Sequence, residues 1–196
     1  MARRPGLRET TFDRRQGSRA TKRKVLVVCE GETEFSYFEG LTESDLPDVD
    51  VVLRPEKSRK GPQKDRVIAH AREARSKAAY SAVWAVFDAD GENVRGLCEE
   101  AETAEINTAV SNPTFEVWLI LHLRDRVKAR TAAELQRELK KLLPQWSKGA
   151  GTKFHHFAKG LPDACKRARQ YPDYQLPSTQ VWRLMADICQ SPQSTS

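Results

Sequence analysis

Two stretches of the chain are continuous in apolar residues over the length of a β-strand. Residues 24–29 read Lys-Val-Leu-Val-Val-Cys, and residues 82–87 read Ala-Val-Trp-Ala-Val-Phe. Unbroken apolar runs of this length are typical of strands that are buried on both faces of a parallel sheet. Shorter apolar runs at 48–53 and 105–110 predict a second and a fourth strand between and after them.

Apolar residues at helical spacing fill the intervals between these strands. The predicted helices are one capped by Thr33, one over 65–80, a short one through Leu97 and Ala101, and one that begins at 111–113. This alternation predicts an α/β fold with a mostly parallel four-stranded sheet flanked by helices. Only helical patterns follow residue 130, at 131–143, 153–171 and 178–189, so we expect a C-terminal helical extension.

The chain has 196 residues, enough for one folded domain with a helical appendage. We expect a basic disordered tail over 1–23, an α/β core over 24–130, a helical extension packed on the core over 131–190, and disorder over 191–196. The first 24 residues hold nine Lys/Arg against two acids, whereas the remainder holds 24 basic and 25 acidic residues. Such a tail either attracts a polyanion or only solubilises the chain.

Hydropathy and cysteine usage bear on the cellular compartment. No apolar stretch of a secretory signal precedes Lys24, and no window has the ~20 apolar residues of a membrane span. The four cysteines are scattered and include no Cys-x-x-Cys pair, which argues against a zinc ribbon or a disulfide framework. We therefore expect a cytoplasmic protein with reduced thiols and no membrane partner.

Acidic residues follow the first and third predicted strands. Glu30 comes directly after 24–29, and Asp88 and Asp90 follow 82–87. Because ligands of a parallel sheet bind beyond the carboxyl ends of its strands, these three side chains should meet there and repel one another unless a cation lies among them. Oxygen ligands without His or Cys favour Mg²⁺ or Mn²⁺, and Glu34, one helical turn after Glu30, is a further candidate ligand. The alternative is a helix cap with salt bridges in the loops.

Other polar residues have two interpretations each. Glu116 falls in the first turn of a predicted helix, where it either stabilises the helix dipole or adds a metal ligand. The basic residues of the segment 54–64 either clamp a nucleic-acid backbone or are only solvated; they are Arg54, Lys57, Arg59, Lys60 and Lys64. His122 is expected to be a satisfied core histidine, and Phe154 and Phe157 to be packing residues, although rings among lysines also suit base stacking.

Four motifs together resemble a known family. They are Val-Val-Cys-Glu-Gly-Glu-Thr-Glu at 27–34, Val-Phe-Asp-Ala-Asp at 86–90, Ser-Asn-Pro-Thr-Phe-Glu-Val-Trp-Leu at 111–119 and Pro-Ser-Thr-Gln-Val at 177–181. The first two are similar to the Toprim domain of topoisomerases, primases and OLD-type nucleases, and the whole set resembles the RloB-like family found near restriction and phage-defence loci. The resemblance implies a Toprim-like fold, Mg²⁺ dependence, nuclease activity and an ATPase partner protein. It also implies that Glu30 is the acid–base residue and that Asp88 and Asp90 are metal ligands.

We therefore expect a Mg²⁺-dependent nuclease that cleaves RNA or DNA in defence against phage or mobile elements. One alternative is a phosphatase of the haloacid-dehalogenase type, because Asp88-Ala-Asp90 resembles its nucleophile loop. The other is a non-catalytic nucleic-acid-binding subunit of a defence complex. No Gly-x-x-x-x-Gly-Lys loop is present, so ATP hydrolysis would come from another chain. The sequence leaves open whether the chain forms a homo-oligomer.

Overall fold

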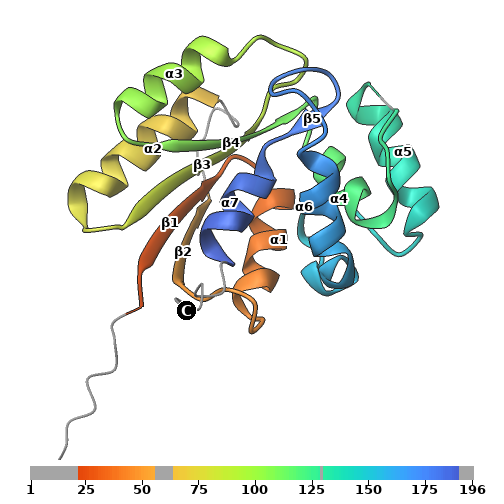
Figure 1. The fold of residues 1–196 in the computed structure, drawn as a ribbon, viewed down its shortest axis with the longest axis horizontal. Coiled ribbons are helices and arrows are strands. Elements are labelled where there is room, and N and C mark those ends of the chain that lie inside the picture. Colours follow the sequence, from red (N-terminus) through yellow and green to blue (C-terminus); the bar gives the residue numbers. More distant parts are fainter. Residues whose placement is uncertain (1–21, 56–63, 129, 190–196) are drawn as a thin grey trace, which may run out of the picture.

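A five-stranded sheet with helices on both faces forms the centre of the protein (Figure 1). The computed structural model describes residues 22–55, 64–128 and 130–189. The strand order is β2-β1-β3-β4-β5; the first four strands are parallel, and β5 is antiparallel to β4. The strands are β1 (Lys24–Cys29), β2 (Asp50–Pro55), β3 (Ala82–Asp88), β4 (Asn107–Asn112) and β5 (Ser178–Thr179).

Each face of the sheet is covered by a separate group of helices, as Figure 1 shows. One face carries α2 (Lys64–Lys77) and α3 (Arg95–Thr103), and the other carries α1 (Glu32–Thr42), α4 (Glu116–Leu123), α5 (Ala132–Leu142), α6 (Leu161–Ala168) and α7 (Val181–Ile188). In β1, Val25 and Val27 pack toward α1 and α4, whereas Leu26 and Val28 pack toward α2 and α3. Burial on both faces explains why this strand has no alternating polar positions.

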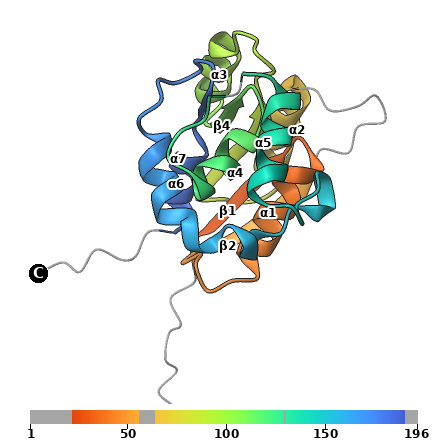
Figure 2. The ribbon, with the colours of Figure 1, turned by 90° about the vertical axis from the view of Figure 1, so that its right-hand side faces the viewer.

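The helices after residue 130 share the hydrophobic core of the sheet. In Figure 2, α5 and α6 lie around α4, and both contact it, while α7 contacts β4 and α6. Leu135 and Leu139 of α5 belong to the same buried cluster as Val27 of β1. The predicted start of α5 is confirmed by a capping box, in which Thr131 Oγ1 accepts a hydrogen bond from Glu134 N and Glu134 Oε2 accepts one from Thr131 N.

The prediction of four strands was wrong, because β5 adds a fifth at the end of the sheet. Its two residues pair with the last two of β4, and Ser111 Oγ and Thr179 Oγ1 lie 2.8 Å apart. This pairing extends β4 to residue 112, so the helix predicted to begin at 111–113 begins at Glu116 instead. A two-residue strand has no periodicity, so no sequence pattern could reveal it.

Two helix predictions also need correction. The predicted helix 153–171 consists of the 3₁₀ turns Phe154–His156 and Ala158–Gly160 followed by α6. A Cβ at Gly160 would lie 2.2 Å from the carbonyl oxygen of His122, so the chain is packed too tightly there for a side chain. The residue before α1 is Gly31, not Thr33, because the Thr33 hydroxyl is buried and accepts a hydrogen bond from Gly149 N at 3.0 Å.

His122 is a core residue with both ring nitrogens satisfied, as the sequence predicted. It is 5% exposed; Nδ1 lies 2.8 Å from Phe157 O, and Nε2 lies 3.1 Å from the Tyr37 hydroxyl. Burial lowers the pKa of His122 to about 3, so the ring is neutral at physiological pH. The pair ties α1 to α4 inside the aromatic core.

Replacing Tyr37 by Phe is expected to lower the free energy of unfolding by about 1–3 kcal/mol. The substitution keeps the ring packing but leaves the buried Nε2 of His122 without its partner. Urea denaturation followed by circular dichroism measures the difference. Tyr80→Phe is the matched control, because Tyr80 is only partly buried, and an equal loss in both variants would contradict the assigned role of the hydroxyl.

Both predicted disordered ends lie almost entirely outside the described residues, which begin at Lys22 and end at Cys189. Arg23, which was placed in the basic tail, instead donates a hydrogen bond to Asp187 O at 2.9 Å and so contacts α7. All four cysteines are free thiols. Among the described residues, no helix combines the length and apolar character needed to cross a bilayer.

Candidate functional site

The carboxyl ends of β1 and β3 bring Glu30 and Asp88 into direct contact. The two strands are adjacent and in register, with Cys29 opposite Val86. Glu30 N donates a hydrogen bond to Val86 O at 2.9 Å, and Glu30 Oε2 accepts one from Asp88 N at 2.9 Å. The backbone at the end of β3 therefore holds the Glu30 carboxylate, which follows β1.

Glu34 lies in the first turn of α1 and is almost completely buried, with 4% of its surface exposed. Its carboxylate folds back over the turn that connects β1 to the helix. A Cβ at Gly31 would lie only 2.7 Å from Glu34 Oε2. Glycine at position 31 thus leaves room for the carboxylate beside Glu30.

Glu116 approaches the same edge from the first turn of α4 and is 2% exposed. Its Oε1 atom and the Oδ1 atom of Asp88 are buried, and neither has a hydrogen-bond partner among the described residues. Both Glu34 and Glu116 raise the pKa of Asp88 through their charge, which places the three carboxylates in one electrostatic cluster. Two buried acceptor oxygens without donors are unusual in a protein interior, and either a proton or a cation would satisfy them.

Asp90 occupies the exposed rim of this cluster rather than its interior. Its φ of +54° is in the left-handed region, and its backbone N–H donates to Pro113 O at 2.9 Å. Its carboxylate lies 3.0 Å from Lys64 Nζ, and the same ammonium lies 3.2 Å from Glu92. Lys64 at the start of α2 therefore neutralises the outer acid of the Asp-x-Asp pair.

Glu30, Glu34, Asp88 and Asp90, but not Glu116, line a cavity of about 420 Å³. Another part of its wall comes from Lys148 and Gly149, which lie between α5 and α6 and belong to the helical extension. Gly149 has a φ of +69°, and a Cβ there would lie 2.5 Å from Glu32 Oε2, so the turn fits closely against the start of α1. A larger hollow of about 750 Å³ lies beside Lys24 and Asp50, at the amino ends of β1 and β2 and so away from the carboxylates.

Burial raises the pKa of the inner carboxyl groups. Desolvation raises the pKa of Glu34 to about 7, with further upward contributions from Glu30 and Glu116. Desolvation also raises the pKa of Glu30 and, together with the charges of Glu34 and Glu116, holds the pKa of Asp88 well above its ordinary value. At neutral pH this cluster is stable only if it retains protons or receives a cation.

The donor set suits a hard divalent cation. Within 22–55, 64–128 and 130–189, no group of three or more His, Cys, Asp or Glu side chains is arranged so that it could hold a metal ion. The carboxylates of the site nevertheless supply only oxygen ligands, two of them buried without partners among the described residues, and this is the type of ligand that Mg²⁺ and Mn²⁺ prefer. Glu30, Glu34, Asp88 and Glu116 are the residues that fit, whereas Asp90 would first have to separate from Lys64.

The predicted basic loop is only partly within the described residues. Arg54 lies on the exposed side of β2, not in a loop, and Lys64 begins α2 and pairs with Asp90 and Glu92. Lys57, Arg59 and Lys60 lie outside the described residues. Their role in nucleic-acid binding stays a prediction.

Lys148 carries no recognisable sequence signal, and the role of Asn112, although it lies in one of the family motifs, was not predicted. Lys148 follows a segment without apolar periodicity, and only the packing of its turn against α1 brings it to the cavity. Asn112 was placed at a helix start, but its side-chain oxygen accepts a hydrogen bond from Gly91 N at 3.1 Å and so holds the loop that carries Asp90. Phe154 and Phe157 are buried core residues, which confirms the packing interpretation.

Comparison with known families gives one match. The sequence model of the family described as RloB-like protein matches residues 25–188, from β1 to α7, and this range includes all five acidic residues of the site. The comparisons with curated proteins and with solved structures gave no significant match.

Proposed function

Because the chain belongs to the RloB-like family, we propose that it is a divalent-metal-dependent nuclease that hydrolyses phosphodiester bonds in RNA or DNA. The observation that carries this proposal is the burial of Glu34, Glu116 and the Oδ1 atom of Asp88, with two carboxylate oxygens that lack partners among the described residues. A Toprim-like relationship of the α/β core, a cytoplasmic location and a role in defence against phage or mobile elements belong to the same proposal.

The physical reason is the cost of unpaired buried charge. Removing a carboxylate from water costs several kcal/mol unless a hydrogen-bond donor or a cation replaces the lost hydration. Lys148 lowers the pKa of Glu34 only slightly against the larger effect of desolvation, and Lys64 is already engaged with Asp90. A bound divalent cation would supply the missing charge, bind a substrate phosphate and lower the pKa of a water ligand.

The carboxylates of the site divide into two roles under this proposal. Glu34, Asp88 and Glu116 supply ligand oxygens from fixed positions at the ends of one strand and two helices. Glu30 lines the cavity and is only half-buried, so it has access to solvent and can take up or release a proton as general base or acid. Its hydrogen bond from Asp88 N fixes the orientation of the carboxylate.

The phosphatase alternative requires Asp88 to act as a nucleophile. Its Oδ1 atom is buried between the charges of Glu34 and Glu116, which is a poor position for attack on a phosphate ester. Turnover of p-nitrophenyl phosphate would favour this alternative. Binding of nucleic acid without cleavage in any metal would favour a non-catalytic subunit.

The proposal predicts that the chain cleaves nucleic acid only with a divalent cation. Labelled total RNA and plasmid DNA are incubated with the purified chain in Mg²⁺, in Mn²⁺ or in EDTA, and products are separated on denaturing gels. We expect cleavage of at least one polymer with metal, none in EDTA, and recovery when excess Mg²⁺ is added. Equal cleavage in EDTA, or no product from either polymer with either metal, would contradict the proposal.

A further inference from the structure

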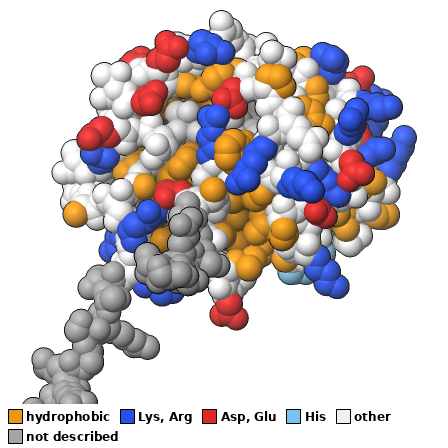
Figure 3. Space-filling view, viewed as in Figure 1, with side chains coloured by type: hydrophobic (Ala, Val, Ile, Leu, Met, Phe, Trp, Pro, Cys, Tyr) orange, Lys and Arg blue, Asp and Glu red, His pale blue; other side chains and the backbone are white. Residues whose placement is uncertain are grey.

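Basic residues are concentrated in the helical extension and in the segment that leads into it from residue 124, as well as in the N-terminal segment. From residue 124 onward the sequence has 14 Lys/Arg and six Asp/Glu, a net charge of +8, whereas residues 25–123 have ten and 19, a net charge of −9. Figure 3 shows Lys and Arg side chains gathered on the side of the molecule formed by α5 and α6. The two halves of the fold therefore have opposite charge, and a polyanion would be attracted to the extension.

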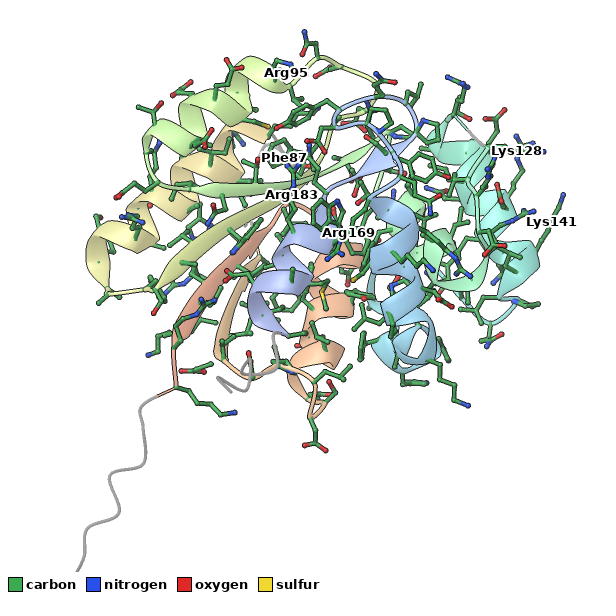
Figure 4. The ribbon with its side chains drawn as sticks, in the orientation of Figure 1. Phe87, Arg95, Lys128, Lys141, Arg169 and Arg183 are labelled. Carbon is green, nitrogen blue, oxygen red and sulfur yellow. The ribbon has the colours of Figure 1, made fainter. Side chains whose placement is uncertain are left out.

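One hollow of the extension contains cations and no carboxylate. It has a volume of about 490 Å³ and is lined by Arg126, Lys128, Arg130, Gln170 and Tyr171, with two apolar neighbours. Arg126 and Lys128 are exposed, and within the described part of the chain neither forms an ion pair. Figure 4 places Lys128 on the outer side of the molecule, near α5. Three cations so close together repel one another, and an anion would relieve this repulsion.

Hydrogen bonds across the hollow hold its two walls together. Val127 N donates to the Tyr171 hydroxyl at 2.9 Å, and Arg130 Nη1 donates to Leu176 O at 3.1 Å. The segment between α4 and α5 is thus fastened to the segment that leads into β5. These hydrogen bonds anchor Val127, which lies between Arg126 and Lys128, and Arg130.

The same wall is connected to the acidic site. Tyr174 O, in the segment that leads into β5, accepts a hydrogen bond from Asn112 Nδ2 at 2.8 Å. The other side-chain atom of Asn112, Oδ1, accepts one from Gly91 N, the residue after Asp90. Because β5 pairs with the carboxyl end of β4, the hollow and the carboxylates lie toward the same edge of the sheet.

We infer that this hollow binds the phosphate backbone of the nucleic acid whose phosphodiester bonds the acidic site hydrolyses, an inference that rests on the proposed function. Guanidinium groups bind phosphate oxygens through paired hydrogen bonds, and the Tyr171 ring gives a base a surface to stack on. The hollow does not include the carboxylates, so its cations would bind the nucleic acid and take no part in the chemical step. A cationic, aromatic hollow at the edge of a phosphodiester site fits a nucleic acid better than it fits an acidic protein.

The test measures binding separately from cleavage. The full chain carrying Asp88→Asn is mixed with a fluorescent single-stranded RNA, or the DNA of the same sequence, in EDTA, and anisotropy is recorded over a series of salt concentrations. We expect Arg126→Ala with Lys128→Ala to weaken binding about tenfold or more near 0.15 M salt. The slope of log K against log salt should fall by about 1.5, as expected for two lost phosphate contacts.

The matched control removes the same charge from the opposite face of the sheet. Arg72 and Arg75 of α2 pair with Glu100 and Glu105 near α3, so Arg72→Ala with Arg75→Ala should leave the affinity within about twofold. An equal loss in both double variants would overturn the inference, because any positive charge would then serve. Unchanged affinity in the first double variant would also overturn it, because the hollow would then not bind the nucleic acid.

The outcomes also separate this inference from the proposed nuclease activity. Binding that depends on Arg126 and Lys128 without any metal-dependent cleavage would support the hollow and contradict the nuclease. Cleavage that is normal in the chain lacking both residues, together with normal binding, would support the nuclease and contradict the hollow. Thermal melting of each variant verifies that the exposed substitutions leave the fold intact.

Discussion

Replacing Asp88 by Asn is expected to lower the rate of metal-dependent cleavage on the order of 10³-fold or more. The substitution keeps the size of the side chain and the backbone N–H that orients Glu30, but removes the charge at the centre of the carboxylate cluster. Single-turnover cleavage of labelled RNA or DNA in saturating Mg²⁺ measures the change. Glu30→Gln should give a similar loss, because it removes the group that exchanges protons with solvent.

Asp50→Asn is the control for this prediction. Asp50 is an exposed acid at the amino end of β2, whereas the carboxylate cluster lies at the carboxyl ends of the strands. Substitution of Asp50 should leave the cleavage rate within about twofold. Circular dichroism and thermal melting identify variants that have lost the fold. Wild-type cleavage rates in both Asp88→Asn and Glu30→Gln would show that the carboxylate cluster takes no part in cleavage.

The stability of the metal-free chain is expected to fall as the pH rises from about 4.5 to about 7. The Glu34 carboxyl has a pKa of about 7 in the folded state against an ordinary value of 4.5, so the folded chain binds its proton more tightly than the unfolded chain. The stabilising effect of this proton is fully present below the unfolded pKa and is lost as the pH rises through the folded one. The loss from this group is at most about 3 kcal/mol.

Urea denaturation in EDTA at intervals between pH 4.5 and 8 measures this dependence. Glu34→Gln should flatten the curve over that interval, because the neutral side chain needs no proton. At pH 8, Mg²⁺ should stabilise the wild type and should stabilise Glu34→Gln less, since the variant lacks one ligand. Identical curves for the two proteins in EDTA would show that Glu34 ionises normally, and the buried cluster would then need a different explanation.

Much of the sheet and the position of its acidic edge follow from local sequence. The runs 24–29 and 82–87 are apolar at every position because both faces of β1 and β3 are covered, and a parallel sheet places the ends of such strands together. The meeting of Glu30 with Asp88 needs nothing more than adjacent strands in register. The motifs at 27–34, 86–90, 111–119 and 177–181 likewise predicted the RloB-like family, which the match over residues 25–188 confirms.

Only the tertiary structure decided which other residues reach the site. Lys64 pairs with Asp90 across 26 positions of the chain, Gly149 reaches Thr33 across 116, and Ser111 meets Thr179 across 68. No periodicity in the sequence predicts these contacts, because each depends on how helices and short turns pack against the sheet. Apolar periodicity records which face of an element is buried, and therefore predicts strands and helices. The partner of a buried polar group is set by distant segments, so the approach of Lys148 to the cavity, the fifth strand and the basic hollow became visible only in three dimensions.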